Sequence, residues 1–218
     1  MKHTIIDTGG SRSFPASHPL LQSQSDDGEI VIVIGTGIAA ALSAIPEPND
    51  KTAILIELGN ECLGVHTGEN QGKEGSNILG FNRFRLGDSA PSNLVELVRQ
   101  PQSVESAIVS AKAVFECAGL AVALCGDFTG RIINRLVRPY FNAALCRLDE
   151  GLASADDIDM TLRLGLGYPE GPIALLERTG LAHHFDVTQD LFESLGELGY
   201  LPARRARVAK SRSLRTVR

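Results

Sequence analysis

A glycine motif after an apolar run is the first feature of the sequence that could do chemistry. Gly35, Gly37 and Ala40 form G-x-G-x-x-A, a turn that brings backbone N–H groups at a helix N-terminus to a pyrophosphate. Glu57 lies 22 residues after Gly35, near the place of an acidic residue that binds a ribose 2′-hydroxyl. Taken alone, these residues predict a site for NAD rather than NADP.

His66 is a second candidate, in a glycine-flanked segment that also holds Glu61 and Glu69. Imidazole titrates near neutral pH, so a histidine held on a loop can act as a general base. We interpret His66 as a candidate base, paired with Glu61 or Glu69; the alternative is a surface histidine. His183 and His184 are expected to be exposed or to lie at a helix terminus.

Five apolar segments of the first half are expected to form strands that position these residues. The run from Glu29 to Ile34 is β-branched and typical of a buried parallel strand. An amphipathic helix precedes the last strand. The predicted strands are 29–34, 52–58, 77–84, 93–98 and 120–125.

After Asp127 the apolar residues follow a helical period. The helix from Ile132 to Leu148 is apolar on too many sides for a surface helix, so other helices or a partner subunit must cover it. We therefore predict a disordered arm (1–28), a reduced α/β domain (29–126), a helical domain (127–202) and a basic tail (203–218). The tail holds seven basic residues and no acids, and we expect it to be solvated.

Composition excludes several functions. Only 5% of the residues are aromatic, none is Trp and the net charge is -5, which disfavours a nucleic-acid partner. No segment is apolar enough for a membrane span, and no histidine–cysteine grouping predicts a metal site. The four cysteines show no C-x-x-C pair, so we expect reduced thiols and a cytoplasmic protein.

The segment from Asp127 to Leu136, with Gly130, Asn134 and Arg135, resembles the start of the C-terminal domain of 3-hydroxyacyl-CoA dehydrogenases. The resemblance continues through Pro139-Tyr140 to the glycine-proline turn Gly165–Pro172 and covers about Gly80 to Pro202. It implies a Rossmann-like parallel sheet followed by a C-terminal helical domain like that of 6-phosphogluconate dehydrogenase. It also implies a homodimer built by the helical domain.

The same resemblance implies site residues. Glu96 matches the glutamate of the family's catalytic His–Glu dyad, and Asn134 matches an asparagine near the substrate oxygen. The histidine of the dyad is absent, because its position holds Asn82 when counted from Gly80, or Phe84 when counted back from Glu96. Neither side chain can take a proton at neutral pH.

The length of the chain gives the glycine motif a second interpretation. In the resembled family, a second strand that carries the ribose-binding acid follows the motif. Three further strands then separate it from the strand that 52–58 resembles, and this chain has no room for them. The favoured alignment therefore makes Ile30–Gly35 the family's fourth strand, with no pyrophosphate on its turn. A reduced nucleotide domain is the alternative, and in both cases a normal NAD site is doubtful.

The family resemblance implies NAD-linked interconversion of 3-hydroxyacyl-CoA and 3-oxoacyl-CoA, with Glu96, Asn134 and His66 as catalytic candidates. Gly35, Gly37, Ala40 and Glu57 are the cofactor-binding candidates. The alternative hypothesis is a degenerate homodimer that binds an acyl-CoA or a protein without catalysis.

Overall fold

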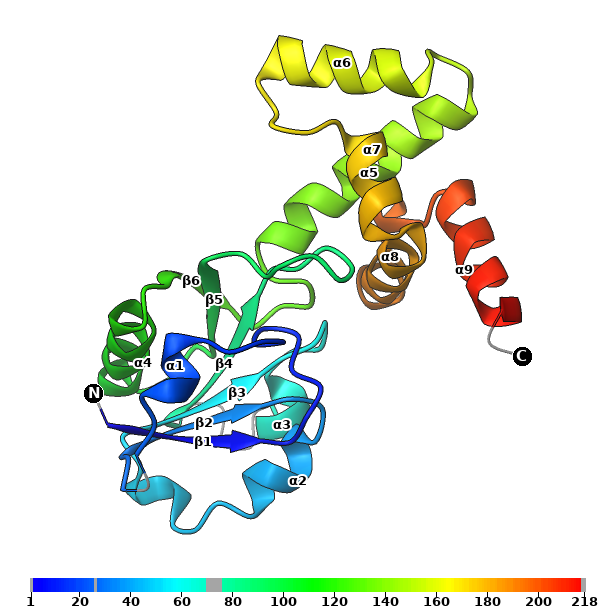
Figure 1. Ribbon diagram of the computed structural model, residues 1–218. Coiled ribbons are helices and arrows are strands. Elements are labelled where there is room, and N and C mark those ends of the chain that lie inside the picture. Colours follow the sequence, from blue (N-terminus) through cyan, green and yellow to red (C-terminus); the bar gives the residue numbers. More distant parts are fainter. Residues whose placement is uncertain (1, 26, 70–75, 217–218) are drawn as a thin grey trace. The chain divides into compact units, whose positions relative to one another are not determined.

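Two compact units make up the chain (Figure 1). The computed structural model describes residues 2–25, 27–69 and 76–216. The first unit comprises Met1–Arg85 and Pro91–Arg131, and the second comprises Leu86–Ala90 and Ile132–Arg218. The second unit thus includes a short loop from the first half of the sequence.

The first unit is built on a six-stranded sheet whose strands lie in sequence order, β1 to β6. Neighbouring strands pair in parallel, except for β5, which is antiparallel to β4. The strands are β1 (His3–Asp7), β2 (Ile30–Ile34), β3 (Ala53–Glu57), β4 (Ile78–Arg83), β5 (Leu94–Arg99) and β6 (Ala121–Gly126). This mostly parallel sheet, followed by a helical half, is the predicted fold class.

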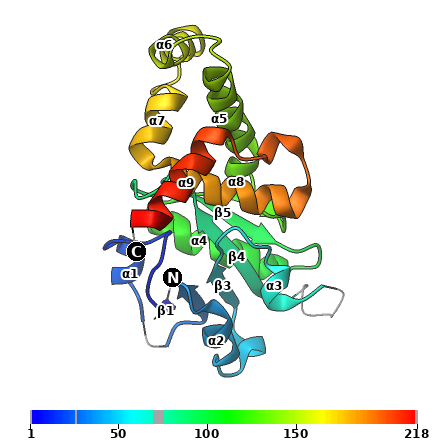
Figure 2. The same ribbon diagram turned by 90° about the vertical axis from the view of Figure 1, so that its right-hand side faces the viewer.

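Helices cover both faces of the sheet, which explains the continuous apolar runs in its central strands. Ile30, Ile32 and Ile34 face a core with helices α1 (Pro19–Gln22) and α4 (Glu105–Cys117). Val31 and Val33 face the opposite core, with helix α2 (Ile38–Ser43) and Leu63, which precedes helix α3 (Gly64–Thr67). Figure 2 shows the same division, with α1 and α4 on one side of the strands and α2 and α3 on the other. A short 3-10 helix, η1 (Pro48–Asp50), follows α2.

The crossover from β1 to β2 has the opposite hand to the next one. Both join parallel neighbours and advance in the same direction across the sheet, yet α1 and α2 lie on opposite faces. Such crossovers are right-handed in nearly all proteins, so one of these two departs from the rule. The strand order also never reverses within β1 to β4, whereas a complete dinucleotide fold has a reversal that opens its binding crevice.

The prediction of a disordered arm at 1–28 is wrong. His3–Asp7 forms the edge strand β1, and the segment after it carries the buried residues Ser13, Phe14 and Leu20. The arm is rich in polar residues, but Ile5 and Ile6 lie in the sheet itself, and Phe14 and Leu20 pack against it. Composition averaged over the segment hides them.

All the regular secondary structure among the described residues of the second unit is helical. A small core of Phe141, Leu145, Ile173 and Leu176 lies between its helices. Within the described part of the chain, no helix is long and apolar enough to cross a membrane. The helices are α5 (Ile133–Asp149), α6 (Ala155–Leu166), α7 (Pro172–Thr179), α8 (Leu181–Leu195), η2 (Leu198–Tyr200) and α9 (Arg204–Thr216).

Pro139 lies inside α5, where it cannot donate the usual hydrogen bond to the carbonyl of Arg135. The hydroxyl of Tyr200 donates to that carbonyl instead, at 3.1 Å. The buried Tyr200 therefore gives the Arg135 carbonyl a donor in place of the N–H that proline lacks.

The basic tail is not a solvated extension. Residues Arg204–Thr216 form α9, which lies beside α8 (Figures 1 and 2). Arg204 and Arg205 pair with Asp149, and Lys210 pairs with Asp186. Acidic residues of earlier helices thus neutralise part of the basic run; Val217 and Arg218 lie outside the described residues.

Candidate active site

The glycine turn after β2 is closed by the chain itself. The Gly35 N–H donates to Glu57 Oε2 at 2.8 Å, and the Gly37 N–H donates to Thr8 Oγ1 at 2.9 Å. Between them, the Thr36 N–H donates to the carbonyl of Gly9 at 3.0 Å. Every N–H group of the turn from Gly35 to Gly37 therefore has a partner within the protein.

The side chain of Glu57 is also fully bound within the protein. Its carboxylate is buried, and its Oε1 accepts the Ser13 N–H at 2.7 Å while its Oε2 accepts that of Gly35. Gly35 has φ of 104°, and a Cβ there would stand 2.4 Å from the Gly9 carbonyl. The Thr8–Ser13 segment thus lies against the glycine turn, where a pyrophosphate and a ribose would have to bind.

The four predicted cofactor-binding residues therefore do not fit a dinucleotide in the arrangement that their motif predicts. Gly37 and Glu57 bind the Thr8–Ser13 segment, and the N–H of Gly35 is bound to Glu57. Ala40 is exposed on α2, a helix of six residues. The absence of a strand-order reversal agrees with these contacts. Both observations support the alignment in which Ile30–Gly35 is not the first strand of a dinucleotide-binding half.

Strand pairing places Asn82 opposite Glu96. The two residues are direct register partners across β4 and β5. Glu96 is 1% exposed, and Asn82 Nδ2 donates to the carbonyl of Leu58 at 2.7 Å. Phe84 follows the end of β4, so the position opposite the glutamate holds an amide and not a ring.

A buried arginine joins this face of the sheet. Arg131 is 3% exposed, and its guanidinium donates to the backbone carbonyls of Gly59 and Glu61. Burial lowers the pKa of Arg131, and the negative charges of Glu96 and Glu61 oppose that shift. Arg131 was missed by the sequence analysis, where its only signal is an arginine directly after the Gly130 turn.

His66 lies on α3 with Glu61 as its acidic neighbour. Its side chain is 11% exposed, and its Nε2 stands 3.5 Å from Glu61 Oε1, which is an ion-pair distance and long for a hydrogen bond. Burial alone would raise the pKa of Glu61, but His66 and the backbone N–H groups of Glu61 and Gly59 outweigh it and hold that pKa below its usual range. Of the two acids considered for His66, the structure pairs it with Glu61.

Asn134 belongs to the second unit. It lies on α5, is 8% exposed, and accepts a hydrogen bond from Arg138 Nε on its Oδ1 at 2.9 Å. Both histidines lie in the first turn of α8, as expected, but His184 is 1% exposed, whereas the side chain of His183 is 47% exposed. The apolar pattern of α8 does not distinguish these two neighbours, because only the packing of α5 against α8 decides which one is covered.

The first unit thus brings together Glu96, Asn82, Arg131, Glu61 and His66, and the second holds Asn134. A set of this kind can position a histidine–carboxylate pair beside a second buried carboxylate. Among the described residues, no cluster of three or more His, Cys, Asp or Glu side chains has the geometry to hold a metal ion.

Solved structures similar to this chain share its architecture, an α/β half followed by a helical half. The profile of the family described as 3-hydroxyacyl-CoA dehydrogenase, C-terminal domain, matches residues 130–214. An (S)-3-hydroxybutyryl-CoA dehydrogenase structure from Ralstonia eutropha superposes with a TM-score of 0.72 at 24% identity, over 85% of this chain and 66% of that one. Residues 130–214, most of the helical half, are thus similar to the C-terminal domain of the 3-hydroxyacyl-CoA dehydrogenase family.

Curated relatives match about half of the chain. The chain is 32% identical over 109 residues to a probable 3-hydroxybutyryl-CoA dehydrogenase of Bacillus subtilis, which covers 50% of this chain and 38% of that protein. It is 38% identical over 105 residues to the human mitochondrial hydroxyacyl-coenzyme A dehydrogenase, covering 48% of this chain and 32% of that protein. The chain therefore spans well under half the length of these relatives in the matched region.

Proposed function

We propose that this chain binds 3-hydroxyacyl-CoA and 3-oxoacyl-CoA thioesters and serves their NAD-linked interconversion, at a rate far below that of its relatives. The match of residues 130–214 to the family's C-terminal domain carries this proposal. The names of the curated relatives supply the substrate class and the reaction.

The proposed roles follow from the residues present. Asn134 hydrogen-bonds an oxygen of the acyl group, and the buried Glu96 keeps its family position opposite Asn82. His66 replaces the missing histidine as the base that exchanges a proton with the 3-hydroxyl group. Glu61, at 3.5 Å, orients its imidazole.

A second function is favoured by two specific observations. Asn82 stands where the base is expected, and the N–H groups of the glycine turn are all bound within the chain. Both favour a homodimer that binds an acyl-CoA or a protein partner without catalysis. The two proposals share the acyl-CoA ligand and differ in the chemical step.

Titration of the purified protein with NADH and with acetoacetyl-CoA, followed by nicotinamide fluorescence, separates the proposals. Oxidation of NADH that depends on acetoacetyl-CoA supports the dehydrogenase. Binding of acetoacetyl-CoA without any oxidation supports the non-catalytic homodimer. Binding of neither ligand would contradict both.

We expect NAD(H) to bind weakly, with a dissociation constant no tighter than roughly millimolar, or ~4 kcal/mol of affinity. The physical reason is that the turn's donors and Glu57 are already engaged. Equilibrium titration of nicotinamide fluorescence measures this constant. The matched variants are Gly37→Asp, in the turn, and Ala39→Asp, an exposed position on the same helix. Low-micromolar binding abolished by Gly37→Asp alone would show that the turn is a working phosphate site.

The homodimer is proposed on the uncovered apolar surface of the second unit. Leu136 on α5 is 70% exposed, Leu164 on α6 is 78% exposed, and α6 has no buried residue at all. Figure 1 shows α6 standing at the end of its unit, and its neighbours there are α5 and the start of α7. A groove of about 340 Å³, lined by Leu136, Tyr140, Tyr168 and Leu175 among others, adds to this surface. Obligate interfaces are apolar surfaces of this kind.

Replacing Leu136 and Tyr140 with aspartate should therefore give insoluble protein, or a destabilised monomer. Light scattering at micromolar concentration measures the mass of both proteins. Val109→Asp is the control, because Val109 is an apolar residue of α4 with 58% exposure in the other unit. A monomeric wild-type protein at that concentration removes the dimer proposal.

The cytoplasm remains the proposed location. The four cysteines are all free thiols, as expected in a reducing compartment.

A further inference from the structure

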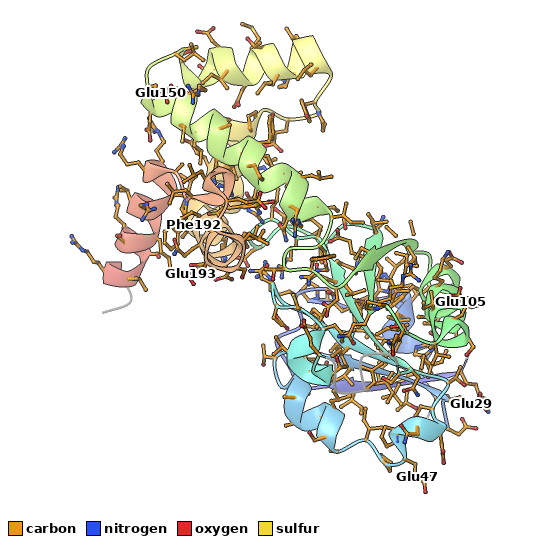
Figure 3. The ribbon with its side chains drawn as sticks, turned by 180° about the vertical axis from the view of Figure 1, so that it is seen from behind. Glu29, Glu47, Glu105, Glu150, Phe192 and Glu193 are labelled. Carbon is orange, nitrogen blue, oxygen red and sulfur yellow. The ribbon has the colours of Figure 1, made fainter. Side chains whose placement is uncertain are left out.

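Four polar side chains form a connected network inside the second unit. Asn134, Arg138 and Asn142 are spaced four residues apart on α5, so they lie on one face of the helix. His184 on α8 faces them. All four are buried, with exposed fractions of 8%, 3%, 4% and 1%. Figure 3, in which Phe192 and Glu193 mark α8 and Glu150 marks the residue after α5, shows the two helices against each other.

The hydrogen bonds of the network have only one consistent direction. A guanidinium only donates, so Arg138 NH1, 3.0 Å away, makes His184 Nδ1 an acceptor. The proton of the neutral ring is then on Nε2, which donates to Asn142 Oδ1 at 3.0 Å. Asn142 Nδ2 in turn donates to the carbonyl of Gly199 at 3.0 Å. Each donor in this chain of hydrogen bonds therefore meets an acceptor.

The hydrogen bond from Arg138 also fixes the orientation of the Asn134 side-chain amide. Arg138 Nε donates to Asn134 Oδ1 at 2.9 Å, so the oxygen of this amide is held towards the protein. The other end of the amide, Nδ2, is then left as the free donor, and within the described residues of its own unit no acceptor is bound to it. Without Arg138, rotation of the amide would present an oxygen or a nitrogen with similar ease.

We propose that Arg138, His184 and Asn142 are positioning residues that hold Asn134 as a hydrogen-bond donor for an acceptor oxygen of the bound acyl group. The inference rests on the proposed acyl-CoA function. It adds that the preference of the site for an acyl chain with a carbonyl oxygen at C3 depends on Arg138 and His184. His184 and Arg138 act through Asn134 and do not themselves contact the ligand.

Two ligands of equal chain length test the specificity. Acetoacetyl-CoA has an oxygen at C3 and butyryl-CoA has none, and isothermal titration calorimetry measures the affinity of each. The wild-type protein should prefer acetoacetyl-CoA by about three- to tenfold, the worth of one neutral hydrogen bond. Asn134→Leu should remove that preference.

The positioning role is tested by a matched pair of variants. His184→Leu should lose the preference for acetoacetyl-CoA while retaining the affinity for butyryl-CoA. His184→Gln should restore it, because its amide can accept from Arg138 and donate to Asn142. A role in packing alone would instead weaken both ligands equally. Loss of affinity for both in His184→Leu, or a preference unchanged in it, would overturn the inference.

A ligand-free measurement separates this inference from the proposed function. In ¹⁵N-labelled protein the side-chain amide of Asn134, assigned by comparison with Asn134→Leu, should give a dispersed pair of proton signals. His184→Leu should move that pair towards the position of free amides, and His184→Gln should not. If the wild-type protein binds neither thioester, the proposed function fails. If the Asn134 signals are the same in the wild-type, His184→Leu and His184→Gln proteins, the network does not position Asn134.

Discussion

Reduction of acetoacetyl-CoA by this protein should be undetectable, or slower by a factor of ~10²–10⁴ than in a relative with an intact His–Glu dyad. The reason is that Asn82, and not a histidine, stands opposite Glu96. A stopped assay of NADH oxidation at saturating acetoacetyl-CoA measures the rate. Asn82→His, which places an imidazole beside Glu96, should recover part of the lost factor.

Any residual turnover should depend on His66. We expect His66→Ala to remove most of it and Glu61→Gln to reduce it, because Glu61 is the acid that the structure places beside the imidazole. His183→Ala is the control, since that side chain is half exposed in the other unit. Robust activity untouched by both His66→Ala and Glu96→Gln would mean that the chemistry uses other residues.

The second unit should lose stability in acid through His184. Burial, and then the charge of Arg138, lower the pKa of this histidine from an ordinary 6.5 to about 3. The unfolded chain therefore takes up the proton first as the pH falls. The stabilisation is complete above pH 6.5 and is lost progressively between pH 6.5 and 3. By pH 4 the loss from this one group should be roughly 3 kcal/mol.

Tyrosine fluorescence isolates this effect, because the chain has 3 Tyr and no Trp, and all three, Tyr140, Tyr168 and Tyr200, lie in the second unit. The measurement is the urea midpoint of that signal at pH 7 and pH 4. His184→Gln has no proton to gain, so its midpoint should fall much less than that of the wild-type protein. His183→Gln should behave as the wild-type protein does. Equal falls in all three proteins would show that His184 does not control the acid response.

Local patterns in the sequence were enough to predict the strands β2 to β6 and the helical half. Runs such as Ile30–Ile34 are apolar and β-branched at every position, which is typical of strands buried on both faces. The glycine turn after β2 was also located correctly, because Gly35 needs a positive φ that the sequence marks with glycine. The family resemblance came from the same kind of local signal, a series of motifs between Gly80 and Pro202.

Contacts between distant residues were beyond such patterns. Whether Gly35 and Gly37 serve a phosphate depends on what fills the space beside them, and that is a segment more than twenty residues earlier in the chain. The polar composition of that segment hid both the strand β1 and its role as a partner for the turn. In the same way, α9 is helical because it packs on α8 and pairs with Asp149, although its own composition is that of a solvated tail.

The residues of the candidate site also fall into those that the sequence identified and those that only the tertiary structure decided. From the sequence alone, Glu96, Asn134 and His66 could be named as residues of the right type, and a missing dyad histidine could be noticed. Only strand register decided that Asn82 and not Phe84 faces Glu96, since residues two apart on a strand point to the same face and the alternation cannot distinguish them. Only packing decided that Arg131 and His184 are buried, because burial depends on neighbours from other elements, and no local pattern encodes them.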